Sequence, residues 1–93
     1  MSVRFYIPGP LRPFTGGSGS IELSGSPATA GEALDLLSQL HPGVKDRVVT
    51  EKGEVRPHVN VFVGEESIRF AQGLATPLPE GCEISILPAV SGG

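Results

Sequence analysis

Residues 26–43, SPATAGEALDLLSQLHPG, decide the fold, because no other part of the chain has the periodicity of a long helix. Apolar residues recur here three or four positions apart, and this spacing places them along one face of an α-helix. We therefore expect one helix near residues 29–40 that packs Leu34 and Leu37 on a sheet. Its apolar stripe consists of Ala30, Ala33, Leu34, Leu37 and Leu40.

The residues at the two ends of this helix indicate where it starts and stops. Thr29 stands three positions before Glu32, a spacing that allows a capping box in which each side chain satisfies a backbone N–H at the helix start. Pro42 and Gly43 follow the last apolar residue and predict the end of the helix.

The remaining patterned runs alternate between apolar and polar residues, which predicts strands half buried on a core. The first two runs, on either side of the glycine-rich loop TGGSGS, are expected to pair as an antiparallel hairpin. ESIRF is a candidate for a short strand at the sheet edge, and residues 44–57 read as a loop or a short helical turn. The four alternating runs are VRFYI (3–7), SIELS (20–24), HVNVFVG (58–64) and CEISIL (82–87).

This order of elements, β-β-α-β-(β)-β, predicts a two-layer α+β domain with four to five strands and one main helix on one sheet face. The β-grasp arrangement of ubiquitin is the simplest fold with this order. We expect residues 1–87 to form the β-grasp domain. Pro88 lacks a backbone N–H and should end the last strand, so residues 88–93 should form a flexible tail.

One face of the predicted sheet remains uncovered by the helix. Alternation places Val59, Val61 and Ile84 on the covered face. Phe62 and Leu87 then fall on the opposite face, and an exposed apolar patch commonly marks a protein-binding surface. Ordinary surface exposure is the alternative, since much of any folded protein's surface is apolar.

Composition excludes several classes of function. The 93 residues suffice for one domain with a modest core, which argues against a self-contained enzyme. A net charge of −3 provides no basic field for nucleic acid. The single cysteine, Cys82, excludes an internal disulfide and a cysteine-rich metal site. The start resembles no signal peptide and no run is long enough to span a bilayer, so we expect a cytoplasmic protein without a membrane partner.

The other candidate residues have structural interpretations. Cys82 is expected to be an inert packed thiol, and His41 and His58 lack a second metal ligand or nucleophile at a useful spacing. Arg69 fits a surface role and a contact with a partner's acid equally well. GGSG lacks the Lys and Ser/Thr of a phosphate-binding loop, so no bound nucleotide or other cofactor is expected.

The segment SIRFAQGLATPLPEGCEISILPAVSGG closely resembles the C-terminal third of the ubiquitin-like sulfur carrier proteins, the MoaD/ThiS family. The shared features are a Gly-Gly terminus, a preceding apolar strand and a turn with an acidic residue and glycine. IPGPLRPFTGG and HVNVFVGEE are most similar to the members that supply sulfur for cysteine synthesis. A Gly-Gly end alone would carry little weight, because chain ends often have no function.

The resemblance implies a chemistry for the tail. An α-carboxylate has a pKa of about 3.3–3.7 and is ionised and unreactive at neutral pH. The family implies that an ATP-dependent, E1-like enzyme adenylates Gly93 and that a sulfur donor then leaves a terminal thiocarboxylate. Glycine suits positions 92 and 93 because a backbone without Cβ passes a narrow channel, so Gly92 belongs to the same site. The partner-binding residues implied with Phe62 and Leu87 are Pro88, Ala89, Val90 and Ser91.

Several acceptors of the sulfur remain open. The leading hypothesis is cysteine biosynthesis, with a PLP-dependent cysteine synthase as acceptor and a metalloprotease that later releases cysteine from the tail. The same chemistry would serve molybdopterin synthase through its large subunit, or a thiazole or siderophore pathway. A protein modifier joined to lysines through Gly93 and an interaction domain with an unreactive tail are the alternatives of other classes. The sequence cannot separate the first two hypotheses, because fold and tail are shared and the partner-facing surface selects the acceptor.

Overall fold

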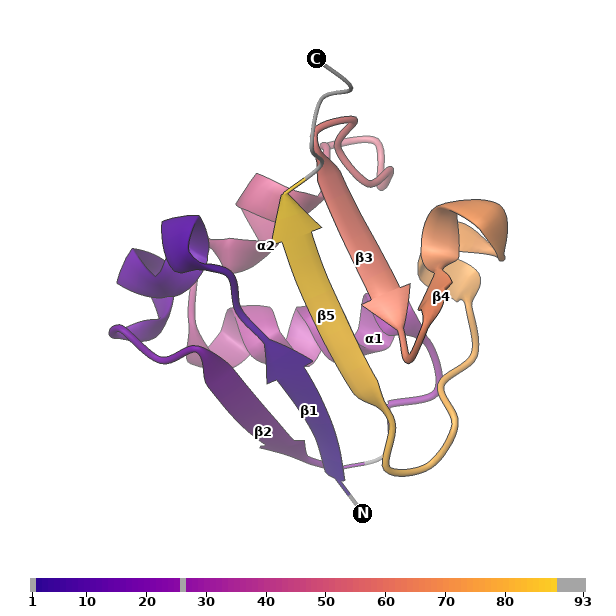
Figure 1. The fold of residues 1–93 in the computed structure, drawn as a ribbon, viewed down its shortest axis with the longest axis horizontal. Helices are drawn as coiled ribbons and strands as arrows, with labels where there is room; N and C mark the ends of the chain where they lie inside the picture. Colours follow the sequence, from indigo (N-terminus) through magenta and orange to yellow (C-terminus); the bar gives the residue numbers. More distant parts are fainter. Residues whose placement is uncertain (1, 26, 89–93) are drawn as a thin grey trace.

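The computed structural model describes residues 2–25 and 27–88. A five-stranded mixed sheet runs in the order β2-β1-β5-β3-β4, and the helices α1 and α2 lie on one of its faces (Figure 1). The strands are β1 (Ser2–Tyr6), β2 (Ser20–Ser24), β3 (Val59–Val63), β4 (Glu66–Ser67) and β5 (Glu83–Pro88). The helices are α1 (Ala30–Leu40) and α2 (Val44–Val48), with the 3₁₀ helices η1 (Gly9–Thr15), η2 (Ile68–Phe70) and η3 (Gly73–Ala75).

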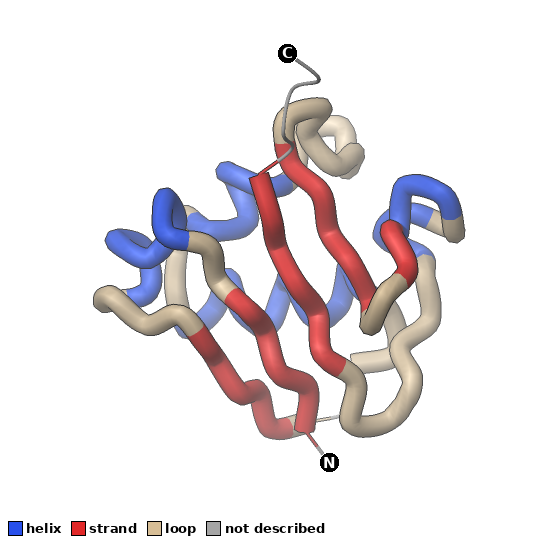
Figure 2. The backbone as a smooth tube through the Cα atoms, in the orientation of Figure 1, coloured by secondary structure: helices blue, strands red, loops and turns tan. Residues whose placement is uncertain are grey.

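The first and last strands lie side by side in the middle of the sheet. β1 pairs with β5 in parallel, and the other three pairs, β1–β2, β3–β5 and β3–β4, are antiparallel. Figure 2 shows the five strands as one twisted layer in front of the helices. This is the two-layer β-grasp arrangement that the order of elements predicted.

The helix α1 begins and packs largely as its sequence predicts. The Thr29 hydroxyl accepts a hydrogen bond from the Glu32 backbone N–H (3.2 Å). This bond is one half of the predicted capping box. In place of the other half, the Glu32 carboxylate accepts a hydrogen bond from the Thr29 hydroxyl (3.4 Å). The stripe residues Ala30, Ala33, Leu34 and Leu37 are fully buried.

Leu40 is an exception, because 62% of its surface is exposed. It is the last residue of α1. At 3.6 residues per turn, position 40 falls at the edge of the buried helix face rather than at its centre. Its assignment to the core stripe was wrong. α2 packs beside α1 and contributes the fully buried Val44 and Val48 instead. The 44–57 segment is thus a short helix followed by a turn closed by a Val49–Val55 bridge.

Two connections differ from the sequence prediction. The β1–β2 hairpin is confirmed, but its connection contains the 3₁₀ helix η1, which ends at Gly16 in the left-handed conformation (φ 66°). The predicted edge strand ESIRF is a strand only at Glu66–Ser67 and then turns into η2. Ile68, the first residue of η2, is buried in the core.

Candidate functional site

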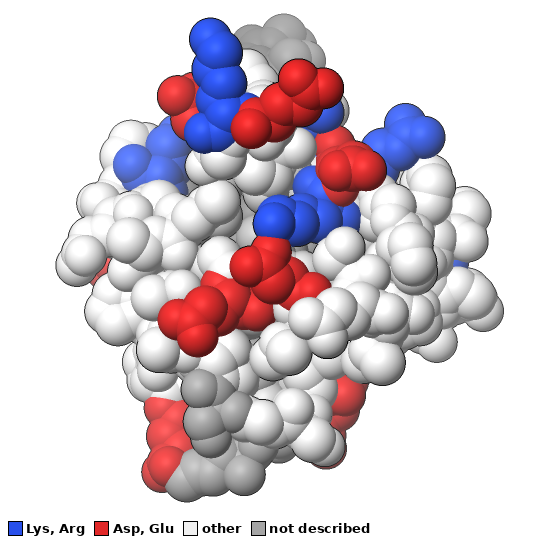
Figure 3. Space-filling model, turned by 180° about the vertical axis from the view of Figure 1, so that it is seen from behind, with Lys and Arg blue, Asp and Glu red and all other residues white. Residues whose placement is uncertain are grey.

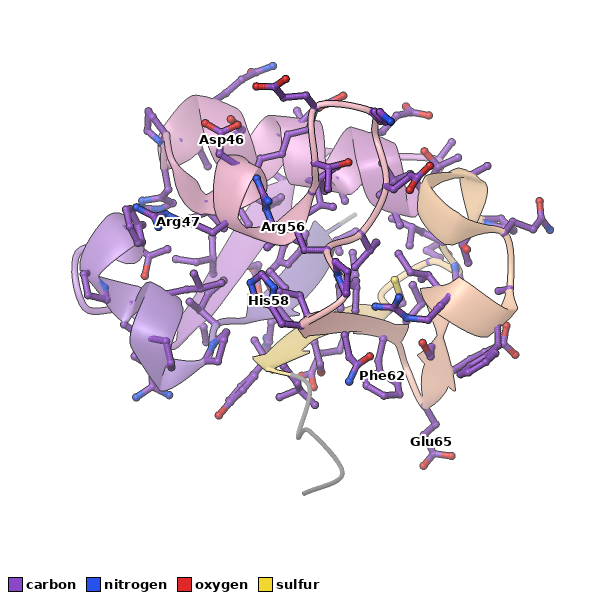
Figure 4. All side chains as sticks on the ribbon, turned by 90° about the horizontal axis from the view of Figure 1, so that it is seen from above. Asp46, Arg47, Arg56, His58, Phe62 and Glu65 are labelled. Atoms are coloured by element: carbon purple, nitrogen blue, oxygen red, sulfur yellow. The ribbon has the colours of Figure 1, made fainter. Side chains whose placement is uncertain are left out.

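The helix-free face of the sheet presents two aromatic side chains on either side of a serine. Ser85 of β5 is registered with Tyr6 on one side and with Phe62 on the other. Phe62 is half-buried and points away from the helices (Figure 4). The outward surface here thus has a small polar side chain between two aromatic ones.

Leu87 completes this surface, which we call the sheet face and define as Tyr6, Phe62 and Leu87. Leu87 is 37% exposed and Tyr6 40% exposed. The structure therefore brings Phe62 and Leu87 together on the uncovered face, as the alternation predicted. Tyr6 was not singled out, although its outward position in VRFYI was the available indication.

The opposite side of the molecule has a different character. Seen from behind, acidic and basic side chains gather close to one another over the helices (Figure 3). One ion pair there joins Lys45 of α2 to Asp35 of α1. Both partners are partly exposed, so the pair contributes little to stability. The helix-free side also carries an ion pair, Arg4–Glu22, so the sheet face is an apolar patch beside charged side chains.

The last described residue of β5 lies at the end of the sheet opposite to the N-terminus. Because β1 and β5 run in parallel, Pro88 lies far from Ser2 (Figure 1). Pro88 pairs with Val59 and so belongs to the strand rather than to the predicted tail. The remaining predicted site residues, Ala89, Val90, Ser91, Gly92 and Gly93, lie outside the described residues.

Cys82 does not have the environment of a reactive thiol. It is half-buried at the start of β5, and burial raises the pKa of its thiol from the ordinary value of 9.0. A backbone hydrogen bond acts in the opposite direction and has the smaller effect. A raised pKa leaves the thiol protonated near neutrality, where thiolate is the nucleophile, so the geometry agrees with an inert packed cysteine.

Arg69 and His58 lie near the start of β3. The Arg69 guanidinium donates to the Val59 carbonyl (2.7 Å) and to the Arg56 carbonyl (3.2 Å). Arg69 thus stabilises the backbone there, a role that sequence reasoning left open. His58 is exposed and lines a groove beside η1 and α2 (Figure 4). Within residues 2–25 and 27–88, no His, Cys, Asp and Glu side chains cluster in a way that could hold a metal ion.

The sequence pattern of the ThiS family matches residues 5–93. The chain belongs to the ThiS family. The sulfur carrier protein CysO of Mycobacterium tuberculosis is 39% identical to it over the full length of both proteins. A chain of the Amycolatopsis orientalis BexX/CysO complex is 41% identical, with a TM-score of 0.87 over 98% of this chain and 99% of that chain. Small archaeal modifier protein 3 of Haloferax volcanii is 39% identical over 71% of each chain.

These relatives confirm the β-grasp fold and the resemblance to ubiquitin-like sulfur carriers. They are carrier and modifier proteins, which agrees with the prediction that this chain is acted on by enzymes rather than being one. None of the helices in the described part of the chain has the length and apolar character needed to cross a membrane.

Proposed function

We propose that the chain is a sulfur carrier whose C-terminal Gly93 is converted to a thiocarboxylate that donates its sulfur to cysteine biosynthesis. The observation that carries this proposal is the full-length 39% identity to CysO, together with a chain that ends in Gly-Gly. The described fold is consistent with this role, because β5 leads the chain out of the centre of a compact body towards that end.

The chemistry requires an activating enzyme, because a carboxylate ionised at neutral pH is a poor electrophile. The Gly93 carboxylate attacks the α-phosphorus of ATP, and pyrophosphate leaves, which gives an acyl-adenylate. Hydrosulfide then attacks the acyl carbon and displaces AMP. One C–O bond is broken, one C–S bond is formed, and the proton of hydrosulfide is lost to solvent. ATP is a substrate of the enzyme and is not bound by this chain.

The proposed partners are an E1-like adenylating enzyme and a PLP-dependent cysteine synthase that takes the sulfur. A metalloprotease that frees cysteine from the tail would complete the cycle. Molybdopterin synthase and a thiazole or siderophore pathway remain alternative acceptors, because the carrier chemistry is the same. The Haloferax volcanii modifier protein favours a second candidate function, in which Gly93 is joined to lysines of other proteins.

The decisive test is the intact mass of the protein after incubation with its host's activating enzyme, ATP and a sulfur source. The wild type should gain the mass difference between sulfur and oxygen. A variant without Gly93, and one with an extra residue after it, should gain nothing and should unfold at the wild-type temperature. Sulfur at the new terminus of the extended variant at the wild-type rate would contradict the proposal. Lysine conjugates in host extracts would favour the modifier function.

A further inference from the structure

A groove of about 230 Å³ lies beside the end of β5 from which the tail leaves. One wall is formed by the apolar side chains of the β1–β2 connection, including Leu11 and Phe14. The other wall is formed by Ile86, Leu87 and the start of β3 at Val59. The groove is therefore built from segments that are far apart in the sequence.

The groove carries positive charge at its rim. Arg47 of α2 lines it, and the Arg47 guanidinium carbon lies 4.8 Å from the centre of the Phe14 ring. Arg56 lines the adjoining hollow, and its Nε donates to the Asp46 backbone carbonyl (2.9 Å). Stacking and the hydrogen bond hold both guanidinium groups in place before any partner arrives. Figure 4 shows them above His58.

These charges are not neutralised within residues 2–25 and 27–88. Neither Arg47 nor Arg56 forms an ion pair with a described carboxylate, the two ion pairs being Arg4–Glu22 and Lys45–Asp35. Asp46 also lines the adjoining hollow, so two guanidinium groups face one carboxylate. The rim is thus locally positive in a chain whose net charge is −3. Such a local reversal favours an acidic partner segment.

Because the tail is short, an enzyme that acts on Gly93 must come close to this groove. Five residues follow Pro88, and an extended chain spans at most ~3.6 Å per residue, so the terminus reaches no more than about 18 Å from β5. An enzyme whose reaction centre lies below its surface must therefore approach the end of the body from which the tail leaves. Ile86 and Leu87 line the groove immediately before Pro88.

We propose that this groove binds an acidic segment of the activating enzyme, in which an Asp or Glu side chain pairs with Arg47 and Arg56 while a neighbouring apolar side chain enters the groove. The inference rests on the proposed function, because it takes the enzyme that adenylates Gly93 as the partner. The apolar walls favour a protein segment over a free phosphate, which would leave Leu11 and Phe14 without a contact. Charge pairing at such a rim mainly raises the association rate and makes binding depend on salt.

The test compares Arg47→Glu with a matched charge reversal, Lys52→Glu, in the turn after α2. Both positions are exposed, and Lys52 does not line the groove. Binding to the host's activating enzyme is measured by calorimetry, and the KM for the carrier is measured in the sulfur-transfer assay. Arg47→Glu should raise Kd and KM at least about tenfold and leave kcat unchanged. Lys52→Glu and Arg47→Lys should stay within about threefold of the wild type, and the salt dependence of Kd should weaken only in Arg47→Glu.

The outcomes separate this inference from the proposed function. Equal losses in Arg47→Glu and Lys52→Glu, or no loss in either while the wild type gains sulfur, would overturn the groove alone. Weakened binding by Arg47→Glu with no sulfur gained by the wild type would overturn the carrier chemistry alone. A wild type that neither binds nor gains sulfur overturns both. If Arg47→Glu does not fold, Arg47→Gln takes its place.

The chain's own tail is the competing occupant. A variant that ends at Pro88 is compared with the full chain by the backbone amide resonances of residues 9–14 and 44–58. Unchanged resonances support a groove left open for a partner. Shifts confined to those two segments would show that the tail occupies the groove, and would overturn the inference.

Discussion

Arg69 shows that the position of a charged side chain decides its role more than its type does. Its guanidinium donates to carbonyls at the entry to β3, so it holds the chain where the groove and the sheet meet. Arg47, which is equally basic, stacks on Phe14 and keeps its donors at the surface. One arginine thus stabilises the body of the protein, and the other is available to a partner.

Cys82 provides a prediction about pH. Burial raises the pKa of its thiol, so above the ordinary pKa the unfolded chain releases a proton that the folded chain retains. Its contribution to the free energy of unfolding is therefore fully present below pH 9.0 and declines as the pH rises through the folded pKa. Urea unfolding at a series of pH values should show a decline above pH 9.0 that is steeper in the wild type than in Cys82→Ala.

Iodoacetamide labelling checks the same shift directly. At pH 8 the native thiol should react more slowly than the thiol of the urea-unfolded chain, because less of it is thiolate. Equal labelling rates in the two states, together with parallel stability curves for wild type and Cys82→Ala, would contradict the prediction.

At the residue scale, neighbours along the chain predicted the environment of Cys82 but not that of Leu40, which is exposed at the end of α1. The packing of Cys82 followed from its place before an apolar strand. The role of Arg69 could not be predicted, because its acceptors lie ten and thirteen residues away and come within reach only after η2 turns back towards β3. The pairing of Arg47 with Phe14 depends in the same way on η1 packing against α2.

At the scale of elements, α1 depends on its first turn for part of its stability. The Thr29 hydroxyl satisfies the N–H of Glu32, and the N–H of Ala30 donates to the Thr76 carbonyl (3.0 Å). The start of the helix is thereby joined to the η3–β5 connection, where Thr29 also forms a bridge with Pro77. Loss of the cap should therefore affect the whole domain rather than one fraying end.

Thr29→Ala should lower the free energy of unfolding by about 0.5–2 kcal/mol, because the N–H of Glu32 loses its acceptor. Thr29→Ser keeps the hydroxyl and serves as the control, with a loss of less than about half that amount. Urea unfolding monitored by circular dichroism measures both variants. A loss in Thr29→Ser as large as that in Thr29→Ala would show that the methyl group, and not the cap, stabilises this end.

Elements whose apolar pattern repeats several times were predictable, and short 3₁₀ segments were not. α1 and the alternating strands repeat their pattern over enough residues to identify the helix or strand period. η1 covers seven residues and η2 only three, and neither offers a repeat. In η1 the available indication was proline at the first turn, a position that suits a residue without an N–H.

At the scale of the molecule, the two faces of the sheet differ in burial. One face packs against α1 and α2, with Phe5, Leu37 and Ile86 fully buried between the layers. The other face exposes the aromatic and aliphatic side chains of the sheet face. Alternation predicted both faces, since it depends only on position within a strand. The groove was not predictable, because its walls come from four separate elements.

Phe62→Ala should weaken binding to the activating enzyme by more than about 1–2 kcal/mol, because aromatic side chains near the centre of an interface contribute most of its binding energy. Phe70→Ala is the matched control, since Phe70 is the same residue type, is 87% exposed and lies in η2 at the sheet edge. Calorimetric titration of the enzyme with each variant gives the affinities. Because Phe62 is half-buried, urea unfolding of each variant shows whether the substitution also destabilises the fold. Combined with Arg47→Glu, the losses should add within about 0.5 kcal/mol if Phe62 and Arg47 contact the enzyme independently. Equal affinities for Phe62→Ala and Phe70→Ala would show that the sheet face is ordinary exposed surface, and recognition would then depend on the tail and the groove.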